Sequence, residues 1–182
     1  MRDGRNTCGQ AYALTVLTPI LESRESSLAR CLSQLQTGSR SPLANVPGTH
    51  FARWVIIGDV TYEGAGQRRD HLHTGRLLFT STFDGSVEPY LEALRVGLGG
   101  AADVIWEHCA GYPGSSDGEA FAAYMRAHQI ESSLFFSAYP ASTVEDVQRS
   151  LASRRRVIDF AVRAQAMSAA ELQAAFQQTF AT

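Results

Sequence analysis

Two polar residues, His50 and Arg53, interrupt an otherwise apolar segment, Thr49 to Ile57, and are the first candidates for chemistry. A histidine titrates near neutral pH, so it can serve as a general base or as a ligand contact. An arginine presents a planar fork of donors that suits an anion or a carbonyl group. The structural alternative for His50 is a hydrogen bond to a loop carbonyl at the start of the segment, after Pro47-Gly48-Thr49.

Strand geometry limits what these two residues can do together. The segment is rich in β-branched and aromatic residues, which predicts a strand. Residues three apart on a regular strand project to opposite faces, so His50 and Arg53 cannot reach one pocket without a bulge or a position at the strand end. A charge buried between Phe51 and Val55 needs a partner. For Arg53, that partner is either a ligand or a carboxylate: Asp84, Asp59 or Glu107.

His108 is the third candidate catalytic residue, in Glu107-His108-Cys109 at the end of a predicted helix. A protonated histidine there would gain from the helix dipole, which is its structural explanation. The same position would suit an axial heme ligand or half of a metal pair.

The remaining polar groups favour structural roles. His71 and His73 share one face of an extended segment next to Asp70, but no third or fourth ligand lies nearby, so we expect no metal site. Asp84 before Gly85 suits a helix cap. His128 suits the edge of a core, and three tyrosines suit the boundary between core and water: Tyr112, Tyr124 and Tyr139.

The elements that must position these residues follow from periodicity and turn signals. Strands are predicted at residues 11–18, 50–60, 76–83 and 133–139. Helices are predicted at about 19–36, through Tyr90 to Leu98 and on to Trp106, and at 121–128. Capping boxes at Ser142–Glu145 and Ser168–Glu171 predict two more helices. Residues 1–10 are predicted to be a disordered tail, and 11–182 a single domain with a C-terminal helical extension.

This order, β-α-β-β-α-α-β-α-α, predicts an α+β fold. Without the inserted short helix it is the split βαβ order of ferredoxin-like folds, with a four-stranded antiparallel sheet. Such a sheet carries helices on one face only. The strand at 51–57 is apolar on both faces, so the open face must also be covered. A second copy of the same face, in a two-fold dimer, is the simplest cover.

In element order and two-faced strands, residues 11–165 resemble the dimeric α+β-barrel superfamily of ferredoxin-like proteins. That superfamily includes cofactor-free monooxygenases, heme-degrading enzymes, heme peroxidases and ligand-binding regulatory domains. The dye-decolorising peroxidases within it carry Gly-x-x-Asp-Gly, and Ser81 to Gly85 here lacks the first glycine. Fold alone does not choose among these functions.

The resemblance implies a protein that binds a small hydrophobic molecule, with oxidoreductase chemistry of the monooxygenase or heme-dependent kind. Arg53 would then fix a polar group, and His50 or His108 would act as base or heme ligand. The alternative is a non-catalytic ligand-binding or protein-interaction module. The sequence contains no Ser-His-Asp order, no nucleotide-binding glycine loop and no CxxC motif. The absence of these catalytic motifs favours that alternative.

Composition narrows the partners. The net charge of −2 gives no nucleic-acid footprint, and the run Arg154-Arg155-Arg156 suits a solvated helix face. The sequence contains no lysine, which excludes lysine Schiff-base chemistry. Its three cysteines lack metal-site spacing. With no secretory apolar region and no apolar run near ~20 residues, we expect a cytoplasmic protein with no membrane partner.

Overall fold

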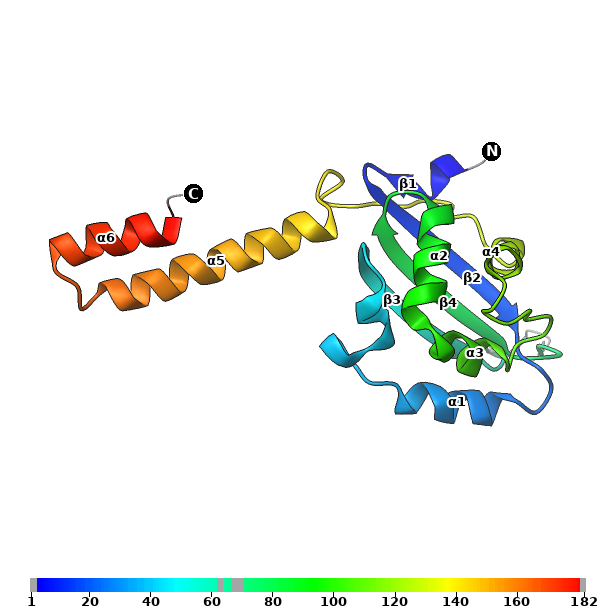
Figure 1. Ribbon diagram of the computed structural model, residues 1–182. Helices are drawn as coiled ribbons and strands as arrows, with labels where there is room; N and C mark the ends of the chain where they lie inside the picture. The colour runs from blue at the N-terminus through cyan, green and yellow to red at the C-terminus, as the bar shows by residue number, and fades with distance from the viewer. Residues whose placement is uncertain (1–2, 62–63, 67–70, 181–182) are drawn as a thin grey trace. The chain divides into compact units, whose positions relative to one another are not determined.

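The computed structural model describes residues 3–61, 64–66 and 71–180. Its contacts divide the chain into two compact units, residues 1–141 and 142–182. The described residues contain six α-helices and one antiparallel sheet (Figure 1). Within those ranges, no helix combines the length and apolarity needed to cross a membrane. The α+β class predicted from the sequence is confirmed.

The first unit is built on a four-stranded antiparallel sheet with the spatial order β1-β2-β4-β3. The strands are β1 (Thr7–Cys8), β2 (Ala11–Pro19), β3 (Thr49–Ile57) and β4 (Arg76–Asp84). The central strand β4 pairs with both long neighbours, and Phe79 lies opposite Val16 on one side and Trp54 on the other. The sheet is open and does not close into a barrel.

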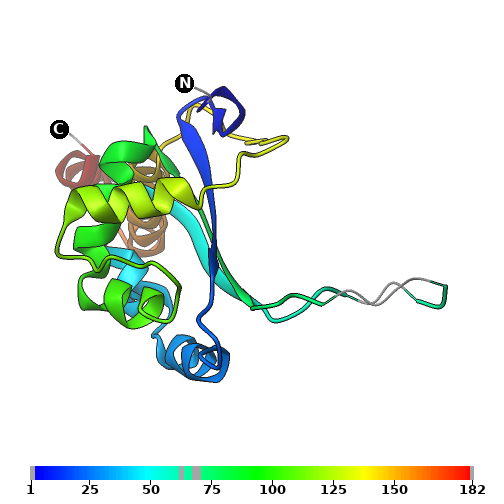
Figure 2. The ribbon, with the colours of Figure 1, turned by 90° about the vertical axis from the view of Figure 1, so that its right-hand side faces the viewer.

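Four helices cover one face of this sheet (Figure 2). They are α1 (Glu25–Gln34), α2 (Val87–Leu98), α3 (Gly100–Trp106) and α4 (Gly118–Ala127). Short 3-10 turns occupy Asp3–Arg5, Gly38–Arg40 and Pro42–Asn45. Alternate strand residues point into the core beneath the helices, where Trp106 meets Phe79 and Phe121 edge to face at 5.5 and 6.2 Å. Period-2 alternation along β4 therefore separates a buried face from an open one.

The fourth strand predicted at residues 133–139 does not form. The outer edge of β2 is occupied by β1 at one end, and at the other by Gln129 and Ile130, whose amide donates to the Thr15 carbonyl at 2.8 Å. The following residues have strand-forming side chains but no ladder, and Leu134 and Phe136 are 87% and 79% exposed. Strand propensity depends on context, and here the edge is already taken.

Two other boundaries also differ from the prediction. The helix predicted from residue 19 begins at Glu25, because Pro19 is still in β2 and Ser23 adopts a left-handed turn at φ 62°. The predicted disordered tail instead contributes β1. Asn6 is buried there, and its side-chain oxygen accepts from the Ser132 amide at 2.8 Å.

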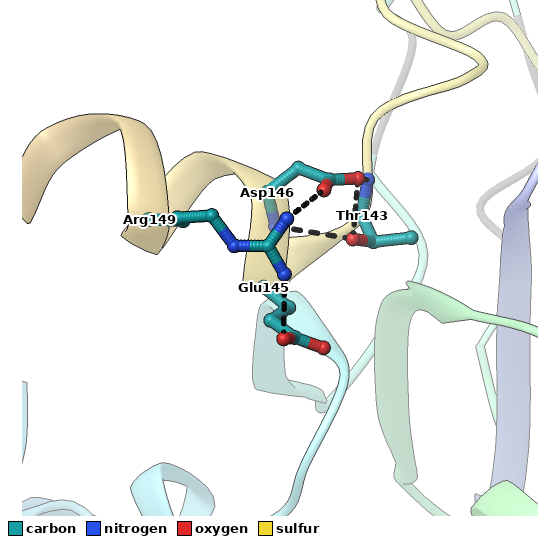
Figure 3. A network of polar contacts seen from close by, with 4 residues as sticks. All are labelled: Thr143, Glu145, Asp146 and Arg149. Carbon is teal, nitrogen blue, oxygen red and sulfur yellow. Dashed lines mark hydrogen bonds and ion pairs between the residues drawn. The ribbon is translucent and has the colours of Figure 1, made fainter. Parts of the chain in front are cut away.

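The second unit is a helical hairpin of α5 (Val144–Ala164) and α6 (Ala169–Phe180). Its first capping box lies one residue later than predicted. Thr143 is the N-cap, and its hydroxyl and backbone amide both donate to the Asp146 carboxylate (Figure 3). In the opposite direction, the Asp146 backbone amide donates to the Thr143 hydroxyl oxygen at 3.1 Å. Arg149 adds ion pairs to Glu145 and Asp146 on the same turn.

The hairpin is held by Phe160 of α5, which packs against Phe176 and Phe180 of α6 at ring distances of 5.9 and 5.3 Å. No residue of either helix is fully buried. An exposed apolar stripe runs along α5, on the side away from Phe160 by helical spacing. It consists of Val147, Leu151, Ile158 and Val162.

We predict that Gly97→Ala destabilises the protein by about 1–3 kcal/mol, because a Cβ in this part of α2 would overpack the neighbouring turn. It would lie 2.8 Å from the Asn45 carbonyl oxygen and 2.9 Å from Val46. The loss should exceed the ~1 kcal/mol that alanine gains in helix propensity. Urea unfolding measures it. The control is Gly100→Ala, where no atom lies within 4 Å of the added carbon. Equal stability of the two variants would contradict the packing argument.

We also predict that a chain ending at Ala141 folds on its own, since the buried residues of the described chain lie between Asn6 and Met125. Its thermal midpoint, followed by circular dichroism, should stay within about 4 °C of the full chain. A chain ending at Ala127 is the comparison, because it also loses the pairing of Gln129 with Val16 on β2. A large drop in the thermal midpoint of the chain that ends at Ala141 would contradict the assignment of the core.

Candidate functional site

The open face of the sheet carries ordered cross-strand rows. The strand pairing places one polar row next to one apolar row. The polar row is Thr15, Thr80 and Arg53. The apolar row is Leu17, Leu78 and Val55. On the other side of the polar row, Thr82 lies between Ala13 and Phe51. The face therefore combines a narrow polar band with apolar surface on both sides.

Arg53 lies in this polar band and not against a carboxylate, and its side chain is exposed, so the buried charge expected from the sequence is wrong. Its Nε donates to the Thr80 hydroxyl at 3.2 Å, and within the described part of the chain it forms no ion pair. Asp84 and Asp59, two of the partners expected from the sequence, bond His50 and His71 instead. The Arg53 guanidinium therefore keeps further donors, and Arg53 is one of the residues that line a shallow hollow of about 490 Å³. This hollow is lined by Phe51, Ala52, Arg53, Thr80, Ser81 and Thr82.

A β-bulge between Thr49 and Phe51 changes the position of His50. Without it, alternation would turn His50 to the covered face. With it, Thr49 takes that side and its hydroxyl meets the Tyr90 hydroxyl at 3.2 Å. His50 Nε2 lies 2.8 Å from Asp84 Oδ1, at the end of the open-face positions of β4. From the sequence, a bulge is the exception that would let His50 and Arg53 lie on the same face, and the structure contains that bulge.

The His50–Asp84 pair has a defined chemical capability. A carboxylate accepts hydrogen bonds, so in this pair His50 donates through Nε2. When the imidazole carries only that proton, Nδ1 is an acceptor, which is the arrangement of an oriented general base. Both side chains are largely covered and still reachable by solvent.

Tyr90 of α2 supports this corner of the sheet from below. Its hydroxyl contacts Ser81 at 2.5 Å as well as Thr49, and its ring stacks on Phe83 at 3.5 Å. Burial raises the pKa of Tyr90, although the bonds to Ser81 and Thr49 oppose that change. The Tyr90 phenol is thus neutral, and its hydrogen bonds to Ser81 and Thr49 hold the bulge in place.

His108 lies apart from this site. It is only 6% exposed, its Nδ1 has no hydrogen-bond partner among the described residues, and its carbonyl accepts from the Leu21 amide. It is absent from the linings of the hollows beside Trp54, at Arg53 and at Tyr112. A heme ligand needs a cavity in front of the imidazole, and these hollows give His108 none, so we derive no step through a heme.

His71 of the long β3–β4 connection has a structural contact instead. His71 Nδ1 lies 2.7 Å from Asp59, which also accepts from the amides of Leu72 and Val60. The bond to His71 and then those from Leu72 and Val60 lower the pKa of Asp59 to about 2. Asp70 lies outside the described residues. Among those described, no group of three or more His, Cys, Asp or Glu side chains could hold a metal ion.

The other predicted candidates do not join the site. Tyr112 donates to Asp103 at 2.9 Å, and His128 Nδ1 contacts the Tyr124 carbonyl at 2.9 Å, both on the helical side. Tyr139 is exposed. The threonines beside Arg53 were missed, because single threonines in a strand carry no signal until the pairing of strands is known.

Comparison with protein-family models, with curated proteins and with solved structures gives no match to this chain. The case for function therefore rests on the geometry of the open face.

Tyr90→Phe should destabilise the protein by about 1–3 kcal/mol, because Ser81 and Thr49 would each lose a buried hydrogen-bond partner. Denaturant unfolding measures the change. Tyr139→Phe removes the same atom at an exposed position and should change stability by less than about 0.5 kcal/mol. If Tyr90→Phe behaves like this control, the hydroxyl does not hold the bulge.

Proposed function

We propose that this chain binds a small, largely hydrophobic molecule on the open face of its sheet, and that a second copy of the chain covers that face. The observation that carries the proposal is Arg53, an exposed cation without an ion-pair partner in the described structure, in a polar row next to a row of apolar side chains. A guanidinium in such surroundings suits a polar group on an otherwise apolar ligand.

The architecture supports a ferredoxin-like dimer of the α+β-barrel kind. The order β2-β4-β3 with helices on one face agrees with that arrangement, and the missing ladder at 133–139 departs from it. The segment after α4 projects on the side of the sheet away from the helices (Figure 2). Within this segment Leu134 and Phe136 are exposed, and Phe51 of β3 is 78% exposed. Large apolar groups gathered on one side are typical of an interface.

Binding is supported more directly than turnover. The His50–Asp84 pair supplies an oriented base, which would serve proton abstraction from a bound molecule. Oxidoreductase chemistry is inferred only from the resemblance to the superfamily. A ligand-binding role without catalysis uses the same face and needs only Arg53 and the apolar rows.

A protein-interaction role is a second candidate, and the exposed stripe on α5 favours it. Val147, Leu151, Ile158 and Val162 lie on one side of a helix that has no buried residue. An amphipathic helix with an uncovered apolar side commonly docks into a groove of another protein.

Sedimentation equilibrium over a range of protein concentrations tests the open-face dimer. Phe51→Asn should weaken self-association at least ~10-fold, since replacing a buried aromatic ring with an amide costs more than ~1.4 kcal/mol. Val96→Asn, on an exposed part of α2, is the matched control and should leave the dimer intact. Equal behaviour of the two variants would reject the open face as the interface.

Ligand binding is tested by thermal shift with fatty acids, aromatic acids and hemin. Stabilisation by one compound class that Phe51→Asn abolishes supports the site, and stabilisation that survives this change places the ligand elsewhere.

A further inference from the structure

The charge on the open face is unbalanced at its centre. Arg53 lies in the middle row, and its only polar contact in the described structure is the neutral Thr80 hydroxyl. The other charged groups on this face lie toward its ends. Arg76 donates to Thr74 at 3.1 Å at one end, and Asp84 bonds His50 at the other. The central rows thus contain one cation and no carboxylate.

Covering this face with a second copy makes the imbalance worse. Two open faces packed together would enclose two copies of Arg53 in a space whose other central residues are threonines and apolar side chains. Packed sheets lie ~10 Å apart, so both guanidiniums would lose water and repel each other. Without a ligand, the dimer should therefore dissociate easily, because the two enclosed guanidiniums repel each other although the surfaces around them are apolar.

We propose that the ligand is an amphiphilic organic carboxylate, and that its binding strengthens the dimer by neutralising Arg53. This inference rests on the open-face dimer proposed above. The carboxylate would accept from the Arg53 Nη groups, because Nε already donates to Thr80. The hydroxyls of Thr15 and Thr82 lie in the same row or the next one and can also donate. The hydrocarbon part would cover the apolar row of Leu17, Leu78 and Val55.

Both halves of the ligand are needed for this effect. A neutral amphiphile would cover the apolar row but leave two enclosed guanidiniums unpaired. A small carboxylate would supply the charge but would not replace the water over Leu78 and its neighbours. Coupling between ligand and second copy is then a linkage effect, in which each favours the other by the same factor.

The test measures the dimer dissociation constant by sedimentation with three probes: decanoate below its micelle-forming concentration, 1-decanol and acetate. Decanoate should tighten the wild-type dimer at least ~10-fold, and the other two should change it less than ~2-fold. Arg53→Met, which replaces the cation with an apolar chain, should tighten the dimer without any probe and remove the response to decanoate. Arg53→Lys should keep the response. Arg30→Met, at an exposed position of α1, is the control for loss of one arginine.

The outcomes separate this inference from the proposal beneath it. A wild-type dimer that Phe51→Asn disrupts but that decanoate and Arg53→Met leave unchanged overturns the inference and keeps the open-face dimer. A chain that stays monomeric with every probe and in Arg53→Met overturns both. An equal response to decanoate and 1-decanol shows that the tail alone acts, and overturns the assignment of Arg53.

Discussion

The register of strand β4 is the constraint on which the rest of the structure depends. Phe79 lies between Val16 and Trp54 in the central strand, and it meets Trp106 from the covering helices edge to face. A strand has a side-chain period of two, so fixing Phe79 in the core fixes Leu78 and Thr80 on the opposite face. A slip by one residue would exchange both faces. The aromatic contacts of the core thereby determine which residues stand beside Arg53 on the open face.

The sequence was sufficient for those parts of the fold in which residue type and spacing act locally. The three long strands could be predicted because β-branched and aromatic residues persist for a full strand length between turn formers. The box at Ser168 could be read directly, and the Ser168 amide donates to Glu171 as expected. The start of α1 could not, because Thr18-Pro19 imitates a helix start while Pro19 completes β2 by pairing with Arg76.

The errors that matter for function have one physical origin, which is competition for a partner. Residues 133–139 have the side chains of a strand, but β1 and the segment at Gln129 hold the edge of β2. The partner of Arg53 could not be chosen from the sequence, because three carboxylates were equally available until the pairing of strands placed Thr80 beside it. His50 was assigned by regular alternation to the face opposite Arg53, and a single bulge changed that assignment.

The absence of fully buried residues in α5 and α6 has a consequence for local stability. Amide hydrogens are protected to the extent that the segment holding them resists opening, and protection near the global value requires burial in the cooperative core. In the hairpin, the helical hydrogen bonds are supported mainly by the capping box at Thr143 and by three phenylalanine rings. Its amides should exchange as a separate, weakly protected unit, much faster than those of β4. Any partner that covers the α5 stripe would then be visible first as a slowing of that exchange.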